Sequence, residues 1–480
     1  MTLPDGFVVT LDRRTRVLDG GRALLGGYRT RLIRLSPRAV PLLDGRTLHV
    51  RNRAGAVLAD RLLSTGLAHP AVEALPPHPP GGADGPGCTY VIPAYDRAGQ
   101  LDRLLASIPD GYPVIVVDDA SRRPEAVAAV AAAHGAQLVP LTVNVGPAGA
   151  RNVGLGQVTT PYVVFVDCDV VVSADTVPTL LRHFADPLVV LATPRIVALA
   201  TTRASGWLVR YESIRSSLDL GAFPAAVFPG TPVSWVPSAC MVARVGALTG
   251  LGGFDERMRV GEDVDLCWRA VRDGWRIRYE PGATAAHEHR TGLGSWFRRK
   301  AFYGTGAHPL ATRHPQNIAP ALLPPWGAAL LLALLAQRRW SLPVAACVWG
   351  VATARIADKL ESTEQPVRQA ARLSAGGAVS ALSQGSALLT RHWWPLTALG
   401  CLASPRIRRA AAVAAITDIA LEYHRDATRL DPVRYGIARR LDDLAYGAGV
   451  WISAVKGRST AALRPRIVLS RSRAAATRPR

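Results

Sequence analysis

The sequence predicts an α/β protein with a small α+β unit before it and a mostly helical region after it. Strand-like and helix-like segments alternate from residue 88, a Pro- and Gly-rich stretch separates them from an earlier unit, and long apolar runs begin beyond residue 310. Alternating strands and helices are typical of a parallel sheet with right-handed crossovers. We therefore expect five segments, at residues 1–75, 76–87 (a linker), 88–310 (α/β), 311–455 (helical) and 456–480 (a basic tail).

Composition narrows the functional classes. A chain of 480 residues is too long for one simple core, so more than one domain is expected. The formal charge of +21 indicates an anionic partner: nucleic acid, a phosphate-bearing substrate or an acidic membrane face. Aromatic and basic residues do not interleave as in a nucleic-acid platform, so nucleic-acid binding is not expected. The six cysteines lack C-x-x-C spacing, which indicates neither a zinc site nor a disulfide framework.

Residues 1–75 form a separate unit in this prediction. We expect strands at 7–11, 16–18 and 31–35, one helix that starts at Ser36 with Pro at its first position, and a second helix over 56–65 that ends at Gly66. This order resembles the small winged-helix-like peptide-recognition domains of peptide-modification pathways. The resemblance implies that a peptide binds by adding a strand to a sheet edge. From the residues alone, an accessory domain without a ligand is the simpler interpretation.

The α/β part is justified element by element. We expect strands at 89–93, 114–117, 137–139 and 162–167, and helices at 101–108, 124–134 and 149–157. The G-x-G-x-x-G fingerprint does not follow the first of these strands, which disfavours a nicotinamide dehydrogenase.

Acidic residues mark the carboxyl ends of two of these strands, the edge where open α/β sheets bind ligands. Asp167 and Asp169 follow the apolar run 162–166, and their i, i+2 spacing lets both carboxylates share one hard cation. Asp118 and Asp119 end the second strand and could bond a base or a ribose. A solvated strand-end turn is the plain alternative for each pair.

A turn of small and rigid residues, Asn144 to Gly149, precedes the third helix. Such a turn lets backbone N–H groups approach an anion, with Arg151 as a charge partner. Ordinary turn chemistry competes with this interpretation.

An ordered set of motifs then supports a family resemblance. The segments are VIPAYDR (91–97), VVDDAS (116–121), NVGPAGARNVG (144–154), FVDCDV (165–170), WVPSACMVAR (235–244), GGFDE (252–256) and GEDVDLCWR (261–269). Together they resemble the family-two glycosyltransferases, which act on nucleotide-diphospho-sugars and have the GT-A fold. The resemblance covers roughly residues 88 to 300, and seven segments in order are far more specific than any one alone.

The resemblance implies a metal-dependent, inverting hexosyl transfer. Asp169 would hold Mn²⁺ or Mg²⁺ on the leaving diphosphate, with His287 as a third ligand and His289 as an alternative to it. Asp263 would remove the proton from the acceptor hydroxyl, although an acid at a helix start also complements the helix dipole. The resemblance further implies donor contacts from Pro93, Tyr95, Asp118, Asp119, Arg151 and Asp167, and acceptor contacts from Trp235, Glu262 and Trp268.

The C-terminal third changes composition. The run 318–336 is almost wholly apolar and ends in Gln-Arg-Arg-Trp at 337–340, where Arg and Trp are typical interfacial anchors. The last 25 residues carry eight Lys or Arg and no acid, so we expect a disordered cationic tail. We expect association with the cell membrane, with the catalytic domain in the cytoplasm. A soluble helical subdomain packed on the enzyme is the alternative.

The whole layout, including PDGFVVTLDRRTRVLDGGRALLGG at 4–27, resembles the glycosyltransferases of actinobacterial mycofactocin systems. That resemblance implies transfer of glucose from UDP-glucose onto the peptide-derived redox cofactor mycofactocin or its precursor, as a short β-1,4-linked oligosaccharide. One alternative is a family-two enzyme for a lipid-linked or cell-wall glycan acceptor. Another is a non-catalytic basic adaptor.

Overall fold

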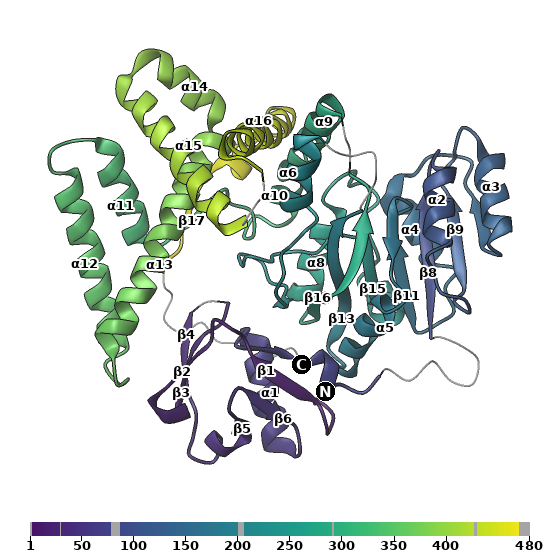
Figure 1. The fold of residues 1–480 in the computed structure, drawn as a ribbon, viewed down its shortest axis with the longest axis horizontal. Coiled ribbons are helices and arrows are strands. Elements are labelled where there is room, and N and C mark those ends of the chain that lie inside the picture. The colour runs from purple at the N-terminus through teal and green to yellow at the C-terminus, as the bar shows by residue number, and fades with distance from the viewer. Residues whose placement is uncertain are drawn as a thin grey trace. The chain divides into compact units, whose positions relative to one another are not determined.

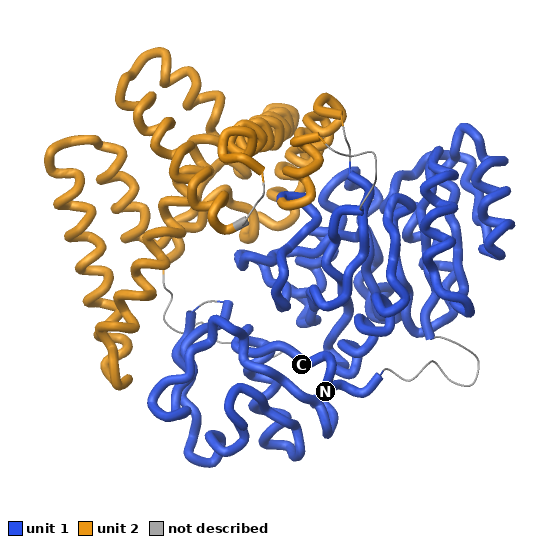
Figure 2. The backbone as a smooth tube through the Cα atoms, viewed as in Figure 1, with its two compact units in different colours: residues 1–204, 215–289 blue, residues 205–214, 290–480 orange. Residues whose placement is uncertain are grey.

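The computed structural model describes residues 2–28, 30–77, 87–199, 206–289, 292–426 and 430–469. The chain divides into two compact units, residues 1–204 with 215–289 and residues 205–214 with 290–480 (Figure 2). Most of the predicted linker, 78–86, lies outside the described residues. Compact units need not coincide with family domains, so the predicted domain bounds stay predictions.

The N-terminal part of unit 1 contains two small antiparallel sheets and one helix. The strands are β1 (Val8–Leu11), β2 (Arg16–Leu18), β3 (Ala23–Gly26), β4 (Arg31–Arg34), β5 (Leu43–Asp44), β6 (Thr47–His49) and β7 (Ala68–Pro70). One sheet has the order β5-β6-β1-β7 and the other β2-β3-β4. Helix α1 (Arg53–Thr65) begins where Asn52 Oδ1 accepts the Gly55 N–H at 2.9 Å, and it packs its buried leucines onto the first sheet.

The three predicted strands and the second helix are confirmed here, but the helix predicted from Ser36 is wrong. Residues after Ser36 form a turn followed only by a short 3₁₀ segment, Val40–Leu42. Pro41 lacks an N–H and disfavours the α conformation at Val40, so a helix that starts at Ser36 cannot continue.

The central sheet of unit 1 carries the predicted α/β pattern (Figure 1). Its strands are β8 (Cys88–Ala94), β9 (Val114–Asp118), β10 (Gln137–Pro140), β11 (Tyr162–Val166), β12 (Val170–Val172), β13 (Val189–Ala198), β14 (Ala225–Ala226), β15 (Cys240–Arg244) and β16 (Arg276–His287). The order is β10-β9-β8-β11-β15-β13-β16-β12, with β14 beside β16. The first four of these strands are parallel, as predicted.

The other half of the sheet is mixed, which corrects the expectation of a wholly parallel sheet. Strand β15 runs antiparallel to both β11 and β13, while β13 and β16 are parallel to each other. Strand β11 is therefore buried between a parallel and an antiparallel neighbour, and all five of its residues are buried. A buried strand reads as a continuous apolar run in either direction, so the run itself could not reveal this.

Helices around the sheet are α2 (Ala98–Leu105), α3 (Pro124–Ala133), α4 (Gly146–Leu155), α5 (Thr176–Leu181), α7 (Val245–Gly250) and α8 (Glu262–Arg272). Helix α4 packs very closely on β8 and β9. A Cβ added to Gly154 would lie 2.3 Å from Val91 Cγ1, so only glycine permits this approach. The close packing brings α4, and Arg151 on it, against the end of β11.

Unit 2 is mostly helical. Its helices are α6 (Trp207–Arg215), α9 (Leu293–Gly304), α10 (Ala307–Arg313), α11 (Pro325–Ala336), α12 (Ser341–Lys359), α13 (Pro366–Ala387), α14 (Trp394–Ala403), α15 (Pro405–Asp426) and α16 (Pro432–Lys456). The apolar run 318–336 does not form one long helix. Pro324 and Pro325 delay the helix start to 325, and the preceding strand β17 (Leu322–Leu323) pairs with β18 (Arg466–Ile467).

Two observations bear on this region, and the expected association with the membrane stays a prediction. Within the described residues, none of the helices combines the length and the apolarity that crossing a bilayer requires. The part of the basic tail that the structure describes is folded rather than disordered, because β18 is hydrogen-bonded to β17. Residues 470–480 lie outside the described chain.

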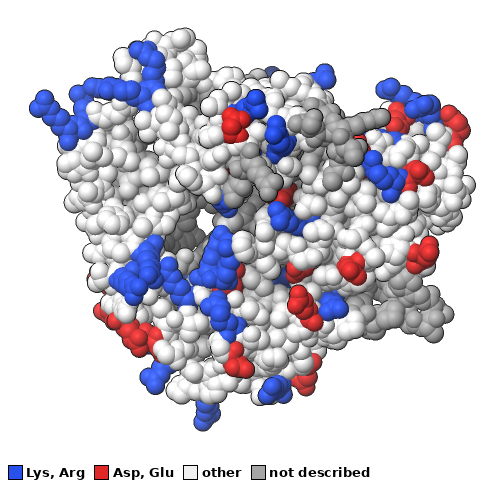
Figure 3. Space-filling model, viewed as in Figure 1, with Lys and Arg blue, Asp and Glu red and all other residues white. Residues whose placement is uncertain are grey.

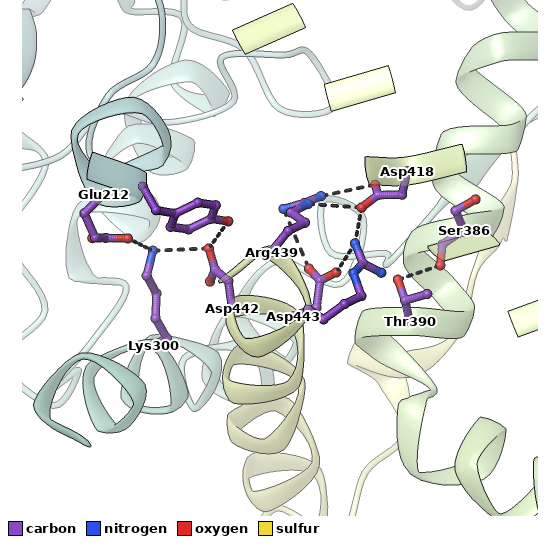
Figure 4. A network of polar contacts seen from close by, with 10 residues as sticks. Glu212, Lys300, Ser386, Thr390, Asp418, Arg439, Asp442 and Asp443 are labelled. Carbon is purple, nitrogen blue, oxygen red and sulfur yellow. Dashed lines mark hydrogen bonds and ion pairs between the residues drawn. The ribbon is translucent and has the colours of Figure 1, made fainter. Parts of the chain in front are cut away.

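Buried charges hold the helices of unit 2 together (Figure 4). Lys300 on α9 lies 3.0 Å from Glu212 and 3.4 Å from Asp442. Arg439 and Arg440 on α16 both bind Asp418 of α15, and both also pair with Asp443. The Lys300 ammonium is therefore buried among acids of its own unit.

Candidate functional site

The carboxyl end of β11 places the first pair of predicted site residues. The main chain turns sharply after β11, and Asp167 N–H donates to Ala239 O of the neighbouring segment at 3.0 Å. The chain then enters β12, which pairs antiparallel with the end of β16 so that Val170 lies opposite His287. Glu288 N–H also donates to Asp169 O at 3.0 Å. Backbone pairing therefore brings Asp169 to His287, which are 118 positions apart in sequence.

The Asp169 carboxylate has two side-chain neighbours. Its Oδ1 lies 3.5 Å from His287 Nε2, and its Oδ2 accepts a hydrogen bond from Arg97 Nη1. The other ring nitrogen of His287, Nδ1, is buried and has no hydrogen-bond partner among the described residues. Of the two histidines that the sequence left open, His287 has a ring nitrogen 3.5 Å from Asp169.

Arg97 was not identified from the sequence, although it ends the VIPAYDR motif. Its guanidinium is about one-third exposed and binds the carboxylate oxygen of Asp169 that is not paired with His287. Burial works against its charge, but the carboxylate of Asp169 raises the pKa of Arg97 above its ordinary value. A positive charge is thus already held beside the acid that was predicted to bind a metal.

The residues at this point suit a divalent cation that is shared with a substrate. One carboxylate and one imidazole are ligands that Mn²⁺ accepts, and Mg²⁺ and Mn²⁺ commonly complete their shells with substrate phosphates. The described residues contain no group of three or more His, Cys, Asp or Glu arranged to hold a metal by themselves. Asp169 and His287 therefore fit a site that needs diphosphate oxygens to be complete.

Arg151 connects the two sides of the site. Its side chain is 2% exposed, and it donates to Asp167 Oδ1 at 2.5 Å and to Glu262 Oε1 at 3.3 Å. Burial opposes its charge, yet Asp167 and Glu262 raise the pKa of Arg151 above the ordinary value. One guanidinium on α4 thus fixes the acid after β11 and the first residue of α8 at the same place.

Asp263, the predicted base, stands next to this ion pair at the start of α8. Gly261 precedes the helix with φ of 83°, a conformation that favours glycine, and this turn directs the acidic residues toward Arg151. Burial, together with the like charge of Glu262, raises the pKa of Asp263 to about 8. Its Oδ1 accepts a hydrogen bond from the adjacent Val264 N–H at 2.8 Å. A carboxylate with a raised pKa can accept a proton near neutral pH.

Asp118 and Asp119 are placed at the sheet edge as predicted, but their oxygens already have main-chain partners. Asp118 Oδ1 accepts the Ser121 N–H at 3.1 Å. Asp119 accepts the N–H groups of Val145 and Gly146 at 2.7 and 2.9 Å, and burial raises its pKa. The anion at the start of α4 is therefore Asp119 itself, which corrects the expectation that this turn awaits a phosphate.

The remaining donor-side and acceptor-side candidates differ in exposure. Pro93 lies within β8, while the Tyr95 ring that follows is 39% exposed and accessible to a ligand. Trp235 is partly buried. Trp268 is only 5% exposed, and its indole N–H donates to Ser234 O at 2.8 Å. Trp268 thus packs against the segment that carries Trp235. Its side chain leaves little surface for the ligand contact that was predicted for it.

A second buried ion pair stabilises α8. Asp265 is fully buried and binds Arg269 Nε at 2.7 Å. The same guanidinium donates to Leu251 O and Gly253 O at 2.6 Å each. Arg269 therefore links the GGFDE segment to α8.

The N-terminal part of unit 1 contacts the start of β16, the strand that ends at His287. Arg276 Nη2 donates to Asp60 Oδ1 of α1 at 2.5 Å, and its Nη1 lies 2.8 Å from Asp186. The rings of Tyr28 and Phe228 stack with centroids 5.4 Å apart. The small domain thus packs on the catalytic sheet next to the segment that leads to Trp235.

The sequence is similar to known glycosyltransferases. Residues 89–228 match the profile of Glycosyl transferase family 2, and residues 162–357 match that of Glycosyl transferase family group 2. The chain is 44% identical over 476 residues to a pre-mycofactocin glycosyltransferase of Mycobacterium tuberculosis, which covers 97% of this chain and 98% of that protein. It is also 23% identical over 236 residues to a poly-beta-1,6-N-acetyl-D-glucosamine synthase of Staphylococcus aureus, covering 47% of this chain and 56% of that protein.

Among solved structures, one similar chain is the mannosyltransferase PcManGT from Pyrobaculum calidifontis, in complex with GDP-Man and Mn²⁺. The TM-score is 0.37 at 22% identity, and the match covers 65% of this chain and 89% of that chain.

Proposed function

Since this chain belongs to glycosyl transferase family 2, we propose that it moves a hexose, with glucose from UDP-glucose as the first candidate, onto mycofactocin or its precursor. The predicted family and the α/β fold class with a GT-A catalytic domain are thereby confirmed. The donor sugar, the inverting course of the reaction, its metal dependence and the acceptor are parts of the proposal.

One observation carries the proposal most directly. Arg151 binds both Asp167 and Glu262, so the acids after β11 and the acids that start α8 meet at one buried guanidinium. A displacement at an anomeric carbon needs charge stabilisation on the leaving side and a base on the attacking side. Asp169 with His287, and Asp263, supply groups suited to these two roles.

The proposed mechanism follows from what each side chain can do. A divalent ion held by Asp169 and His287 would supply Lewis-acid stabilisation of the leaving diphosphate. Asp263 accepts the proton of the acceptor hydroxyl as its oxygen bonds to the anomeric carbon. The bond from that carbon to the diphosphate oxygen breaks with its electron pair on the diphosphate, and direct displacement inverts the configuration. Arg151 holds Asp167 and Glu262 in position through its two ion pairs.

The acceptor assignment rests on similarity and on the layout of unit 1. The 44% identical relative is named for pre-mycofactocin, and the similarity spans nearly the whole of both chains. The N-terminal domain, which resembles peptide-recognition domains, packs beside the segment that leads to Trp235. We propose that it presents a peptide-derived acceptor there, and that repeated transfer builds a short β-1,4-linked oligosaccharide.

For location, we propose the cell membrane, with the catalytic domain in the cytoplasm. The support is the set of exposed apolar side chains in unit 2 and the excess of positive charge over the whole chain.

A transfer assay with mass-spectrometric detection tests this function. The purified protein is incubated with Mn²⁺, UDP-glucose and the peptide-derived acceptor, and in parallel with polyprenyl phosphate. We expect a mass gain of one or more hexoses on the peptide-derived acceptor. Transfer only to polyprenyl phosphate would replace the proposed acceptor, and a screen of other nucleotide sugars in the same assay would correct the donor.

Two variants on the same helix link the result to the site. Asp263→Asn should abolish most of the transfer. Asp273→Asn, a matched change at an exposed aspartate just after the end of α8, should leave the transfer unchanged.

A further inference from the structure

Two helical hairpins of unit 2 bring their turns together. Residues 337–340 connect α11 to α12, and residues 404–409 connect α14 to α15 and begin the latter helix. The side chain of Gln337 donates from Nε2 to Arg406 O at 2.7 Å, so the two turns are hydrogen-bonded neighbours. We call the surface formed by residues 337–342, 399, 402 and 404–409 the hairpin end.

Large apolar side chains are unusually exposed at the hairpin end. Leu402 is 83% exposed, Leu342 72% and Leu399 64%, and Trp340 is half exposed between them. The exposure continues along the outer sides of the helices, at Leu332, Leu335, Val344, Leu396, Val413 and Ile416. Single exposed leucines are normal on a protein surface. A group of them on two adjacent turns indicates a surface that binds an apolar partner.

Positive charge is concentrated at the same place. The arginines of the hairpin end are all exposed, and none forms an ion pair with a carboxylate in the described parts of the chain; they are Arg338, Arg339, Arg406, Arg408 and Arg409. Residues 325–354 and 393–417 contain no Asp or Glu. Figure 3 shows Lys and Arg side chains over the upper-left end of the molecule, next to a broad uncharged surface.

Acidic residues lie at the opposite end of the same hairpin. Asp358, Glu361 and Glu364 are exposed and gather around the turn between α12 and α13. Helix α12 has 19 residues, which corresponds to roughly 28 Å at 1.5 Å per residue. Arg355, Lys359, Arg368 and Arg372 are exposed near these acids, so charges of both signs mix at that end, whereas the hairpin end carries arginines and no acid.

We propose that the hairpin end docks on the surface of an anionic lipid bilayer without crossing it. The arginines would pair with lipid phosphates, while Trp340, Leu342, Leu399 and Leu402 enter the boundary between headgroups and acyl chains. This surface gives the membrane location proposed above a specific site. It does not depend on which sugar or acceptor the enzyme uses.

Charge argues against two other occupants. A second copy of the same surface would place five arginines against five arginines, and like charges at an interface are strongly unfavourable. A nucleic acid would match the arginines but would leave the exposed leucines in water. An anionic bilayer satisfies both kinds of side chain at once, because phosphates lie directly above an apolar layer.

Vesicle flotation with the full-length protein tests the proposal. The probes are phosphatidylcholine vesicles with and without phosphatidylglycerol. We expect the wild type to float only with the anionic vesicles, and to be released as salt rises, because surface charges are screened. Each arginine near an anionic surface contributes about fivefold in affinity, so Arg406→Glu/Arg408→Glu/Arg409→Glu should lower the affinity by more than about 100-fold.

Two further variants separate the contributions. Leu399→Ser/Leu402→Ser should weaken binding to anionic vesicles with little change in the salt dependence. The control, Arg355→Glu/Arg368→Glu/Arg372→Glu, makes the same charge change at exposed arginines of α12 and α13 away from the hairpin end and should float like the wild type. Thermal melting of each variant checks that the exposed substitutions leave the fold intact.

The outcomes are distinguishable. If the wild type ignores anionic vesicles, both the membrane location and this surface are wrong, and transfer to a soluble acceptor still tests the enzyme separately. If the wild type floats and the hairpin-end variants float equally well, only this surface is wrong. A change in mass by light scattering for Leu399→Ser/Leu402→Ser, without any effect on flotation, would make the hairpin end a contact between copies and would overturn the proposal.

Discussion

Two buried ionic clusters, one in each unit, differ in how their charges are matched. In unit 2, Asp418 binds both Arg439 and Arg440, and although burial opposes ionisation, these arginines hold the pKa of Asp418 below its ordinary value. In unit 1, Asp263 is next to Glu262, and burial with this like charge raises its pKa. The arginines of the first cluster favour the ionised form of Asp418, whereas the second cluster favours the protonated form of Asp263.

This difference separates stabilising charge from reactive charge. Removing one residue from a buried cluster of paired charges lowers the stability of the fold, because each deletion leaves an unpaired ion. An acid with a raised pKa costs folding free energy when it ionises, and such costs are concentrated where chemistry occurs. Burial alone does not separate the acids of unit 2 from Asp263, because Asp443 is buried too. Burial raises its pKa as well, but three arginines oppose the shift.

Removal of the proposed base should give the largest effect. Asp263→Asn keeps the size of the side chain and an oxygen for the Val264 N–H, but it cannot accept the acceptor proton. We expect kcat to fall by roughly 10²–10⁴ with donor affinity nearly unchanged, measured by steady-state transfer and by calorimetry of UDP-glucose binding. Asp273→Asn serves as the control, and a kcat close to that of the wild type in Asp263→Asn would remove Asp263 from the mechanism.

The cluster in unit 2 should respond in stability and not in chemistry. Asp418→Ala leaves Arg439 and Arg440 to share Asp443, and we expect the free energy of unfolding to drop by ~3–5 kcal/mol, measured in urea at pH 7. The folded-state pKa of Asp418 is lowered, so its stabilisation is present above the unfolded pKa and disappears as pH falls through the folded value. The difference between variant and wild type should therefore shrink in acid.

Glu361→Ala, at an exposed acid of the same unit, should change the stability far less. Equal losses in Asp418→Ala and Glu361→Ala would show that the buried cluster contributes nothing specific.

A smaller effect of opposite sign is expected for the stability of Asp263→Asn. The folded-state pKa of Asp263 is raised, so the wild type loses stability as pH rises from the unfolded pKa toward the folded one. The Asn variant has no such loss and should be more stable than the wild type at pH 8, and about equally stable at pH 4. Thermal unfolding at the two pH values measures this; a variant that is less stable at pH 8 would contradict the raised pKa.

The smallest effect concerns Arg97. Its guanidinium is partly exposed and pairs with Asp169, and pairs of this kind contribute at most about 1 kcal/mol. Arg97→Gln should therefore tighten Mn²⁺ binding to the free protein by no more than about fivefold in calorimetry, because the ion no longer competes with an internal cation. Asp169→Ala should abolish the same signal. Weaker Mn²⁺ binding in Arg97→Gln would mean that Arg97 assists the ion rather than competes with it.

Much of the site could be predicted because strand ends are local. The run 162–166 and the acids after it specify a buried strand and its carboxyl edge, and the structure places Asp167 and Asp169 there. The position of Asp263 relative to that edge came from the order of the motifs, since no local pattern connects residues almost a hundred positions apart. Its raised pKa depends on burial and on Glu262, which only the folded structure supplies.

Other features could not be read because they depend on long-range partners. Arg97 and Arg151 have long side chains, and nothing in their neighbouring sequence says which carboxylate each will bind. Trp268 lies in the predicted motif, yet helix α8 turns its ring inward onto Ser234. The direction of β15 is likewise unreadable, because a buried strand has the same apolar pattern in either direction. The late start of α11 could have been predicted from Pro324 and Pro325, because proline is tolerated only in the first turn of a helix.

The pH dependence of kcat/KM for the wild type tests the central claim most directly, because this ratio reports the ionisation of the free enzyme. The account predicts that kcat/KM rises with pH along a limb of unit slope and levels off near the raised pKa of Asp263, about 8. Asp263→Asn should lose this limb together with most of its activity. A profile that is already level at pH 5, or a limb that persists in Asp263→Asn, would contradict the assignment of Asp263 as the base.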